Sequence, residues 1–257
     1  MRHTVSHLLP AGLAVAALAG LGLLVHSGAA ITGLDQALSD AVIALRNPPL
    51  DWLVVLVTLF GDATALTLIA VSVVLILLVR RAWWPATACA TAFILTPLIV
   101  KGVKVLVGRP RPTADLYAGV ETFSFPSGHM TNSTVIYGAL AIFAMHALTR
   151  MRGRLAVAAF TLLIMLIGFS RVYLGAHWPS DVVGAVLLAS AMLFLIAWGF
   201  DQMPGEARFA RPYALVTVVM LAIWGVYGVF TIQAALDMYA VDLTPEGAIE
   251  MQPADGR

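Results

Sequence analysis

Residues 170–181 read Ser-Arg-Val-Tyr-Leu-Gly-Ala-His-Trp-Pro-Ser-Asp, a short polar segment between two long apolar runs. The segment places Arg171, His177 and Asp181 within eleven residues of one another. In a chain that is 60% hydrophobic, such a segment is either the solvated cap of a helical hairpin or one part of an anion-binding site. The rest of the sequence decides between these two interpretations.

The composition predicts a membrane protein. Only 11% of the 257 residues are charged, compared with about 25% in a typical soluble domain. The apolar residues fall into runs of roughly 18 or more, long enough to cross the hydrocarbon core of a bilayer as α-helix. We therefore expect an all-α, polytopic transmembrane helical bundle. Its expected spans are residues 8–31, 63–79, 83–107, 129–148, 155–169, 182–200 and 213–232.

Two segments outside these spans have patterns of their own. Residues 33–49 carry scattered charges among apolar positions spaced three and four apart, which predicts an amphipathic helix in the membrane interface, ended by Pro48-Pro49. The run 50–79 is too long for one upright helix. A buried Asp62 would be costly, so Gly61-Asp62 should mark a break at the membrane surface between an interfacial or re-entrant piece and a true span.

The organisation is expected to be a membrane-embedded core over residues 1–200, followed by residues 201–257. The second part would add a seventh transmembrane helix and an acidic tail, which is polar from Ala234 onward and without apolar periodicity. The single cysteine, Cys89, lies inside an apolar run, so we expect a buried hydrophobic residue and no disulfide.

The basic residues predict the orientation of the spans. With the N-terminus inside, eight of the fifteen Lys and Arg residues lie at cytoplasmic ends, a count that decides nothing by itself. Those eight are simple loop charges, however, whereas five of the other seven cluster in residues 101–128 and 170–181. We expect both clusters on the extracytoplasmic face, together with the acidic tail.

Two further polar motifs lie on that expected face. Lys104 and Arg111 stand seven residues apart, and Arg111 belongs to a rigid Arg-Pro-Arg-Pro run. By itself, a basic cluster at a membrane edge commonly binds lipid headgroups. Ser127-Gly128 precedes an apolar run, so free backbone N–H groups and the positive end of a helix should meet there, as in many phosphate sites. An ordinary serine cap followed by an interfacial His129 is the alternative.

The segment 170–181 adds a histidine–carboxylate pair. His177 lies four residues before Asp181, close enough for the carboxylate to accept a proton from one ring nitrogen and leave the other nitrogen free as a nucleophile. Ser180 is expected to cap the following helix, with Asp181 in its first turn. Two histidines, three cations and a helix N-terminus on one membrane face together indicate phosphoryl transfer.

These three motifs resemble the signature of the type 2 phosphatidic acid phosphatase superfamily, which includes bacterial lipid phosphatases and soluble vanadium haloperoxidases. The matching parts are Lys-x6-Arg-Pro (104–112), Pro-Ser-Gly-His (126–129) and Ser-Arg-x5-His-x3-Asp (170–181), in order and without departure. The resemblance covers roughly residues 50–200, so the bundle would be a six-helix phosphatase core plus a seventh span.

The resemblance implies a role for each matching residue. His177 would be the nucleophile that forms a phosphohistidine, Asp181 would orient it, and His129 would be the general acid for the leaving group. The phosphate would be held by Lys104, Arg111, Ser127, Gly128 and Arg171. No metal or other cofactor is expected, because phosphatase members of the family use none and the sequence has no carboxylate cluster suited to one.

Other polar residues near the motifs have weaker assignments. Thr131, Asn132 and Tyr173 are candidates for lining the pocket, although Tyr173 and Trp178 are also typical of the aromatic belt at a membrane interface. Lys101 and Arg109 lie off the motif and are expected to meet anionic lipid headgroups.

The sequence thus predicts an integral phosphatase of the bacterial inner membrane that hydrolyses a lipid phosphate or pyrophosphate at the extracytoplasmic surface. Undecaprenyl pyrophosphate is the first candidate substrate, followed by phosphatidic acid and phosphatidylglycerol phosphate. The expected partners are the lipid substrate and the bilayer, with no nucleic acid. Phosphotransfer from lipid to lipid stays open. A lipid-phosphate transporter would need ionisable residues at mid-membrane depth, where these spans have almost none.

Overall fold

The computed structural model describes residues 2–28, 31–112, 119–203 and 206–239. In these ranges the secondary structure elements are all helices. The helices are α1 (Arg2–His26), α2 (Ile31–Ile43), α3 (Pro48–Leu59), α4 (Ala63–Val79), α5 (Trp83–Val107), α6 (Gly128–Ala147), α7 (Arg150–Tyr173), α8 (Pro179–Asp201) and α9 (Glu206–Tyr239), with a short 3-10 helix η2 (Gly119–Thr122). The predicted fold class, an all-helical membrane bundle, is confirmed.

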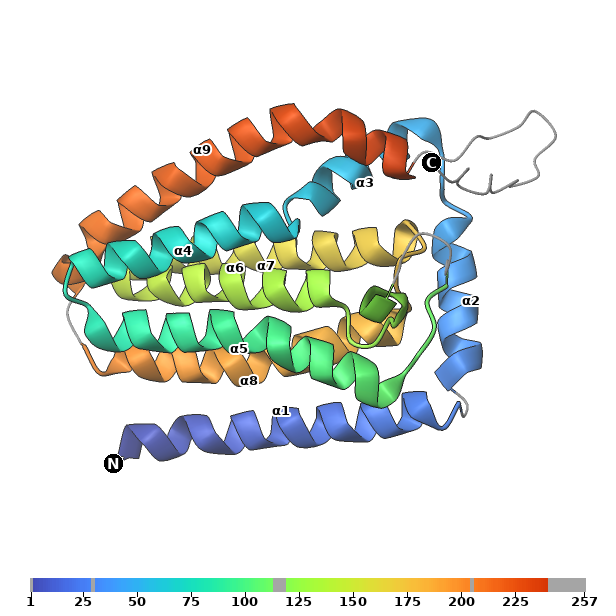
Figure 1. Ribbon diagram of the computed structural model, residues 1–257. Coiled ribbons are helices and arrows are strands. Elements are labelled where there is room, and N and C mark those ends of the chain that lie inside the picture. The colour runs from blue at the N-terminus through green and yellow to red at the C-terminus, as the bar shows by residue number, and fades with distance from the viewer. Residues whose placement is uncertain (1, 29–30, 113–118, 204–205, 240–257) are drawn as a thin grey trace.

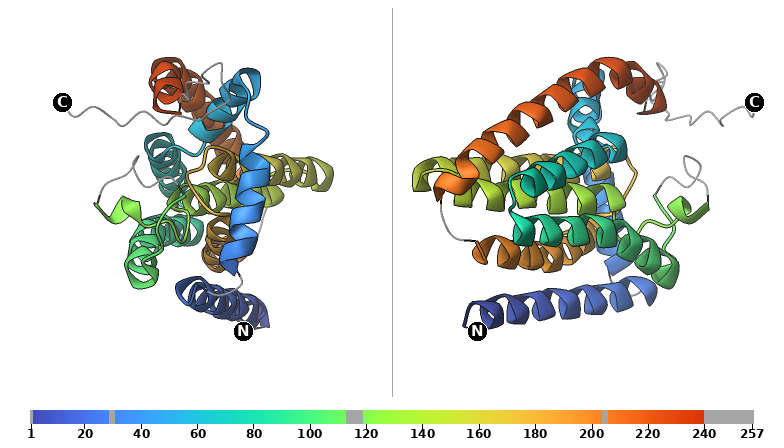
Figure 2. Two further views of the ribbon diagram at one scale, coloured as in Figure 1. Left: turned by 90° about the vertical axis from the view of Figure 1, so that its right-hand side faces the viewer. Right: turned by 60° about the vertical axis from the view of Figure 1, so that its left-hand side comes forward.

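The long helices run lengthwise through the bundle, with α9 inclined to the others, and α2 lies across one end of the bundle (Figures 1 and 2). Within the described residues, six segments are long and apolar enough to cross a membrane: α1, α3 with α4, α5, α7, α8 and α9. Helix α6 is not among them because its first two turns are polar, yet it lies at the centre and packs against α4, α5, α7, α8 and α9.

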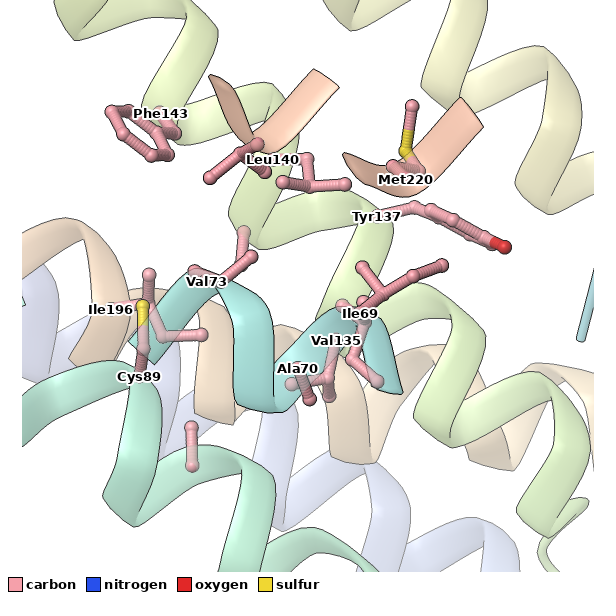
Figure 3. Packing of buried hydrophobic residues seen from close by; sticks show 14 of the residues in the cluster. Ile69, Ala70, Val73, Cys89, Val135, Tyr137, Leu140, Phe143, Ile196 and Met220 are labelled. Carbon is pink, nitrogen blue, oxygen red and sulfur yellow. The ribbon is translucent and has the colours of Figure 1, made fainter. Parts of the chain in front are cut away.

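The hydrophobic core surrounds α6. Tyr137, Leu140 and Phe143 of this helix are buried against Ile69 and Val73 of α4, and Met220 of α9 closes the same cluster (Figure 3). A bilayer core offers no water to unpaired backbone groups, so the apolar runs satisfy those groups internally as helix. Contacts between helices then fix the positions of the helix ends, where the polar motifs lie.

Several predicted boundaries are confirmed and others shift. The break at Gly61-Asp62 is present, and the Asp62 side chain caps α4 by accepting the Thr64 N–H at 2.8 Å. Cys89 is fully buried, as expected. Pro48-Pro49 does not end the amphipathic helix, which stops at Ile43. The prolines instead begin α3, because proline lacks only an N–H that the first helical turn leaves unpaired.

The predicted ends of the last spans were too short. Helix α7 starts at Arg150 and continues through Tyr173, so Ser170 and Arg171 are helical, and the segment that links it to α8 is only residues 174–178. Helix α9 extends to Tyr239, beyond the predicted start of the tail at Ala234. Residues 240–257 of that tail lie outside the described residues.

Candidate active site

All three motifs meet at the end of the bundle that α2 crosses, on the right in Figure 1 and facing the viewer on the left of Figure 2. Gly108 follows the last residue of α5, and its φ of +65° turns the chain into the Arg-Pro-Arg-Pro segment. Glycine adopts this left-handed backbone conformation at little cost. The N-termini of α6 and α8 and the C-terminus of α7 complete this end of the bundle.

His177 lies buried between a carboxylate and a guanidinium. Its Nδ1 is 3.3 Å from Asp181 Oδ2, and its Nε2 is 3.0 Å from Arg111 Nη1. Because a guanidinium can only donate hydrogen bonds, Nε2 must accept, and the ring proton therefore resides on Nδ1, facing Asp181. This tautomer leaves the Nε2 lone pair directed at the cationic side of the site, as a nucleophile requires.

The surroundings of His177 also keep its ring neutral. Burial lowers the pKa of His177 well below its usual value near 6.5, and the nearby cations Arg111, Arg171 and Lys104 lower this pKa further. Each of these effects disfavours the protonated form of the ring. The ring is thus neutral, and its Nε2 lone pair accepts the hydrogen bond from Arg111.

Lys104 and Arg111 are joined by the carboxylate of Glu121, from η2. Glu121 Oε2 is 3.0 Å from Lys104 Nζ and 3.4 Å from Arg111 Nη2, and Lys104 also donates to the Phe123 carbonyl at 2.7 Å. Lys104 and Arg111 are buried, whereas the Glu121 side chain is 64% exposed. An exposed carboxylate therefore bridges the two cations that the sequence assigned to a phosphate.

The start of α6 opens onto a cavity. Ser127 is the N-cap, with its hydroxyl accepting the Met130 N–H at 3.3 Å. Gly128 and His129 line a cavity of about 360 Å³ together with Lys104, Glu121 and Asn132. The first turn of α6, where free N–H groups favour an anion, thus faces the same space as Lys104.

His129 is fixed against the break between α3 and α4. Its Nε2 lies 2.8 Å from the Thr58 carbonyl oxygen, and a Cβ on Gly61 would lie only 2.5 Å from its Cδ2. A carbonyl can only accept, so Nε2 carries a proton in this arrangement. Only glycine leaves room for the ring at this position.

Arg171 is buried and held by two other helices. Its Nη1 is 2.9 Å from Thr58 Oγ1 of α3 and 3.1 Å from the Tyr239 hydroxyl at the end of α9, and the guanidinium lies over the Tyr239 ring at 5.8 Å. Its charge acts on both His129 and His177. The seventh long apolar helix of the prediction therefore contributes a side chain at the site.

Two residues at the site, Arg109 and Ser180, have other partners than the sequence predicted. Arg109 was expected to meet lipid headgroups, but it is buried, with Nη2 2.6 Å from Asp35 Oδ2 and Nη1 2.9 Å from Asp181 Oδ1. Ser180 was expected to cap α8, but it is the second residue of that helix, and its own N–H donates to Asp35 Oδ1 at 2.9 Å. Asp35 of α2 is a hydrogen-bond partner of both residues, at the start of α8.

Two of the three candidate pocket residues lie away from the cavity. Thr131 is buried, and its hydroxyl donates to the Ser127 carbonyl of its own helix. Tyr173 is fully buried, with its hydroxyl 2.6 Å from Asp51 Oδ1, and it does not line the cavity. Asn132 lines the cavity. Trp178 is half-buried and donates to the Pro110 carbonyl at 3.0 Å.

The chain is similar to known proteins over the segment that contains these motifs. Residues 85–203 match the family model described as the PAP2 superfamily, and the match contains all three motifs. The chain therefore carries a PAP2 superfamily domain. Outside the PAP2 match lie α1 to α4 and all of α9, including Asp35, Thr58 and Tyr239.

Several PAP2 relatives and one solved structure are similar to the chain. Phosphatidylglycerophosphatase B of Bacillus subtilis is 29% identical over 184 residues, which are 71% of this chain and 90% of that protein. Lipid A 1-phosphatase of Rhizobium etli is 31% identical over 44% of this chain and 50% of its own length. The crystal structure of a transmembrane PAP2 type phosphatidylglycerolphosphate phosphatase from Bacillus subtilis aligns with a TM-score of 0.62 and 29% identity, over 73% of this chain and 95% of that one.

Proposed function

We propose that the protein is an integral membrane phosphatase that hydrolyses a lipid phosphate or pyrophosphate through a phosphohistidine on His177. One observation carries the proposal: His177 Nε2 has a lone pair in a buried, cationic site while Nδ1 faces Asp181. The names of the relatives, phosphatidylglycerophosphatase B and lipid A 1-phosphatase, support a phosphatase acting on lipids.

In the first step, His177 Nε2 attacks phosphorus, and the bond from phosphorus to the leaving oxygen breaks. Lys104, Arg111 and Arg171 neutralise the phosphoryl oxygens, and the N–H groups at the start of α6 add further donors. The ring becomes a cationic phosphoimidazolium whose Nδ1–H is directed at Asp181. A water molecule then attacks phosphorus, which releases inorganic phosphate and returns the electron pair to Nε2.

His129 is the proposed proton donor to the leaving oxygen and the base for the attacking water. It lines the same cavity as Lys104, which gives it access to a bound phosphate. Since Nε2 donates to the Thr58 carbonyl, His129 acts as an acid after its ring turns from that carbonyl and presents the Nε2 proton to the leaving oxygen. Asn132, one turn further along α6, is proposed to line the entry of the headgroup.

An apolar groove adjoins the cavity at the start of α6, and we propose that it binds the lipid tails. The groove lies between α4, α5 and α6, has a volume of about 390 Å³ and shares the lining residues Ala63, Pro97 and Asn132 with that cavity. A lipid with its tails in this groove would present its headgroup to Lys104 from the side. We propose phosphatidylglycerol phosphate as the first substrate to test, because of the relatives' names, with undecaprenyl pyrophosphate and phosphatidic acid next.

The proposed location is the bacterial inner membrane with the site on the extracytoplasmic side. The distribution of loop arginines supports it. Because Cys89 is buried, cysteines introduced singly at Asp40 and Arg152 would report the orientation. We expect a membrane-impermeant maleimide to label position 40 on intact spheroplasts and position 152 only after lysis; the reverse pattern would contradict the proposed side.

The function is tested with purified protein in detergent micelles. We expect release of inorganic phosphate from at least one of the three lipids, with a chelator present, and loss of that release in His177→Ala. Retention of activity in His177→Ala would reject the proposed nucleophile. Loss of activity in the chelator, restored by a divalent cation, would reject the metal-independent mechanism.

A further inference from the structure

Three charged side chains from separate parts of the chain are buried against each other behind His177. Asp35 of α2, Arg109 of the loop after α5 and Asp181 of α8 are 2%, 8% and 0% exposed. Arg109 divides its guanidinium between the two carboxylates, at 2.6 Å from Asp35 Oδ2 and 2.9 Å from Asp181 Oδ1. Buried charges are costly unless they are paired, and in this cluster each charge has a partner.

Asp181 has its two oxygens committed to different groups. Oδ1 accepts from Arg109, whereas Oδ2 accepts from the Trp178 N–H at 2.9 Å and faces His177 Nδ1 at 3.3 Å. The carboxylate plane is therefore fixed from both sides. A shift of Arg109 would turn the oxygen that orients His177.

Asp35 sets the net charge of the cluster. Arg109 alone would cancel the charge of Asp181 and leave nothing to balance a cationic His177 ring. Asp35 balances Arg109 instead, so that the three side chains together present one net negative charge. Asp35 also accepts from the Ser180 N–H at 2.9 Å and the Ser180 hydroxyl at 2.5 Å, which fixes α2 to the first turn of α8.

We propose that Asp35 and Arg109 are positioning residues, which hold Asp181 in place and keep one net negative charge facing the His177 ring when it becomes a phosphoimidazolium. The inference rests on the function proposed above, because the charge matters only when His177 reacts. It assigns a role to α2, which lies outside the matched PAP2 domain.

Charged and titratable side chains face His177 from the other elements packed against it as well. They are Lys104 of α5, Arg111 of the following loop, His129 of α6 and Arg171 of α7, with Glu121 of η2 bonded to two of these cations. Substitutions at Asp35 and Arg109 leave all of these groups in place. A change in the titration of His177 then reports the charge on its Asp181 side.

The test compares Asp35→Asn, Arg109→Gln and the double variant in phosphate release from phosphatidylglycerol phosphate in micelles. Asp35→Asn should lower kcat roughly 10- to 100-fold with little change in KM, the range seen when outer partners of metal-binding histidines are removed. It should move the acid limb of kcat/KM to lower pH, and Arg109→Gln should move it to higher pH. The double variant, which restores the net charge, should return the limb toward that of the wild type.

The matched control is Asp40→Asn, the same substitution at an exposed position of α2, which should leave the kinetics unchanged. Arg109→Lys keeps the charge but loses the forked geometry, so its kcat should fall while the limb stays in place. The proposed charge balance would be rejected if the acid limbs of the kcat/KM profiles coincided in all variants or shifted in one common direction. Asp35 and Arg109 would then have only a structural role.

Orthovanadate, a mimic of the phosphoryl-transfer transition state, gives a readout without turnover. Its affinity, measured by calorimetry, should fall about tenfold in Asp35→Asn and stay unchanged in Asp40→Asn. A tenfold change in the dissociation constant corresponds to about 1.4 kcal/mol of lost stabilisation. An active wild type with equal affinities in both variants would reject the positioning role alone. A wild type that releases no phosphate from any lipid, but shows this order of affinities, would reject the proposed function alone.

Discussion

The two ends of the helix bundle use arginine in opposite ways. At the end crossed by α2, the cations Lys104, Arg109, Arg111 and Arg171 are all buried and hydrogen-bonded to other parts of the chain. At the opposite end, Arg80, Arg81, Arg150, Arg152 and Arg154 are exposed. Both ends are basic in sequence. Burial with fixed partners, rather than charge, is therefore what distinguishes a candidate site from the loops that orient a membrane protein.

The largest effect is expected when one arginine at each end of the bundle is substituted. Arg111→Gln removes a buried donor that faces His177 Nε2, and kcat/KM for phosphate release should fall roughly 100- to 1,000-fold, as for loss of one preorganised donor to a transition state. Arg152→Gln, at the exposed end, should change it less than about twofold, since surface substitutions stay within about 0.5 kcal/mol. Equal losses in the two variants would show that the comparison is wrong.

A second test uses glycines in tight and open surroundings. Gly61→Ala places a Cβ 2.5 Å from the present position of His129 Cδ2, so the ring must move. A displacement of about 1 Å can cost up to about 100-fold in rate, and we expect a loss of about 10- to 100-fold in kcat. Gly225→Ala in α9, where no atom lies within 4 Å of the added Cβ, is the matched control and should keep wild-type activity.

How much of this site the sequence could predict depends on where each residue lies in the chain. Lys104, Arg111, Ser127, Gly128, His129, Arg171, His177 and Asp181 stand in three compact motifs next to helix ends, and the structure brings these motifs to one end of the bundle. Asp35 could not be found in this way, because it lies 74 residues from Arg109 and 145 from Ser180 in the chain.

Arg109 shows which signal was available. It stands two residues before Arg111 in a rigid Arg-Pro-Arg-Pro run, so a site that holds Arg111 must also lie near Arg109. The length of the apolar runs predicted where the spans lie. It did not predict that α7 ends at Tyr173 and α9 at Tyr239, because tertiary contacts extend both helices past the apolar pattern. The burial of Tyr173 could not be predicted either, because its hydrogen-bond partner Asp51 lies 122 residues away in the chain.

The pH dependence of stability and activity tests how the buried cations at the end crossed by α2 act on His177. Burial and the nearby cations hold the pKa of His177 well below 6.5, so the folded protein keeps this ring neutral where the unfolded chain protonates it. Below about pH 6.5 the unfolded state therefore binds more protons than the folded state. The contribution of His177 to the free energy of unfolding decreases as pH falls through about 6.5. For activity, the acid limb of kcat/KM should lie below pH 6.5, measured with one substrate across buffers of equal ionic strength. A limb at or above 6.5 would contradict a neutral, cation-flanked nucleophile.

The smallest expected effect concerns Glu121, the exposed carboxylate between the two buried cations. Substrate phosphate must replace it on Lys104 and Arg111, so Glu121→Gln should lower KM. Exposed ion pairs are worth about 0.2–1 kcal/mol, which limits the decrease to about fivefold. Initial rates over a range of lipid concentrations measure the change. A raised KM would show instead that Glu121 helps to bind the substrate.

The most direct test of the central claim is to trap phosphate on the protein. Wild-type protein is mixed with a lipid labelled in its terminal phosphate, denatured at alkaline pH and digested, so that acid-labile phosphohistidine survives. We expect label on the peptide that contains His177, and none in His177→Ala. Label on another residue, or continued phosphate release in His177→Ala, would contradict it.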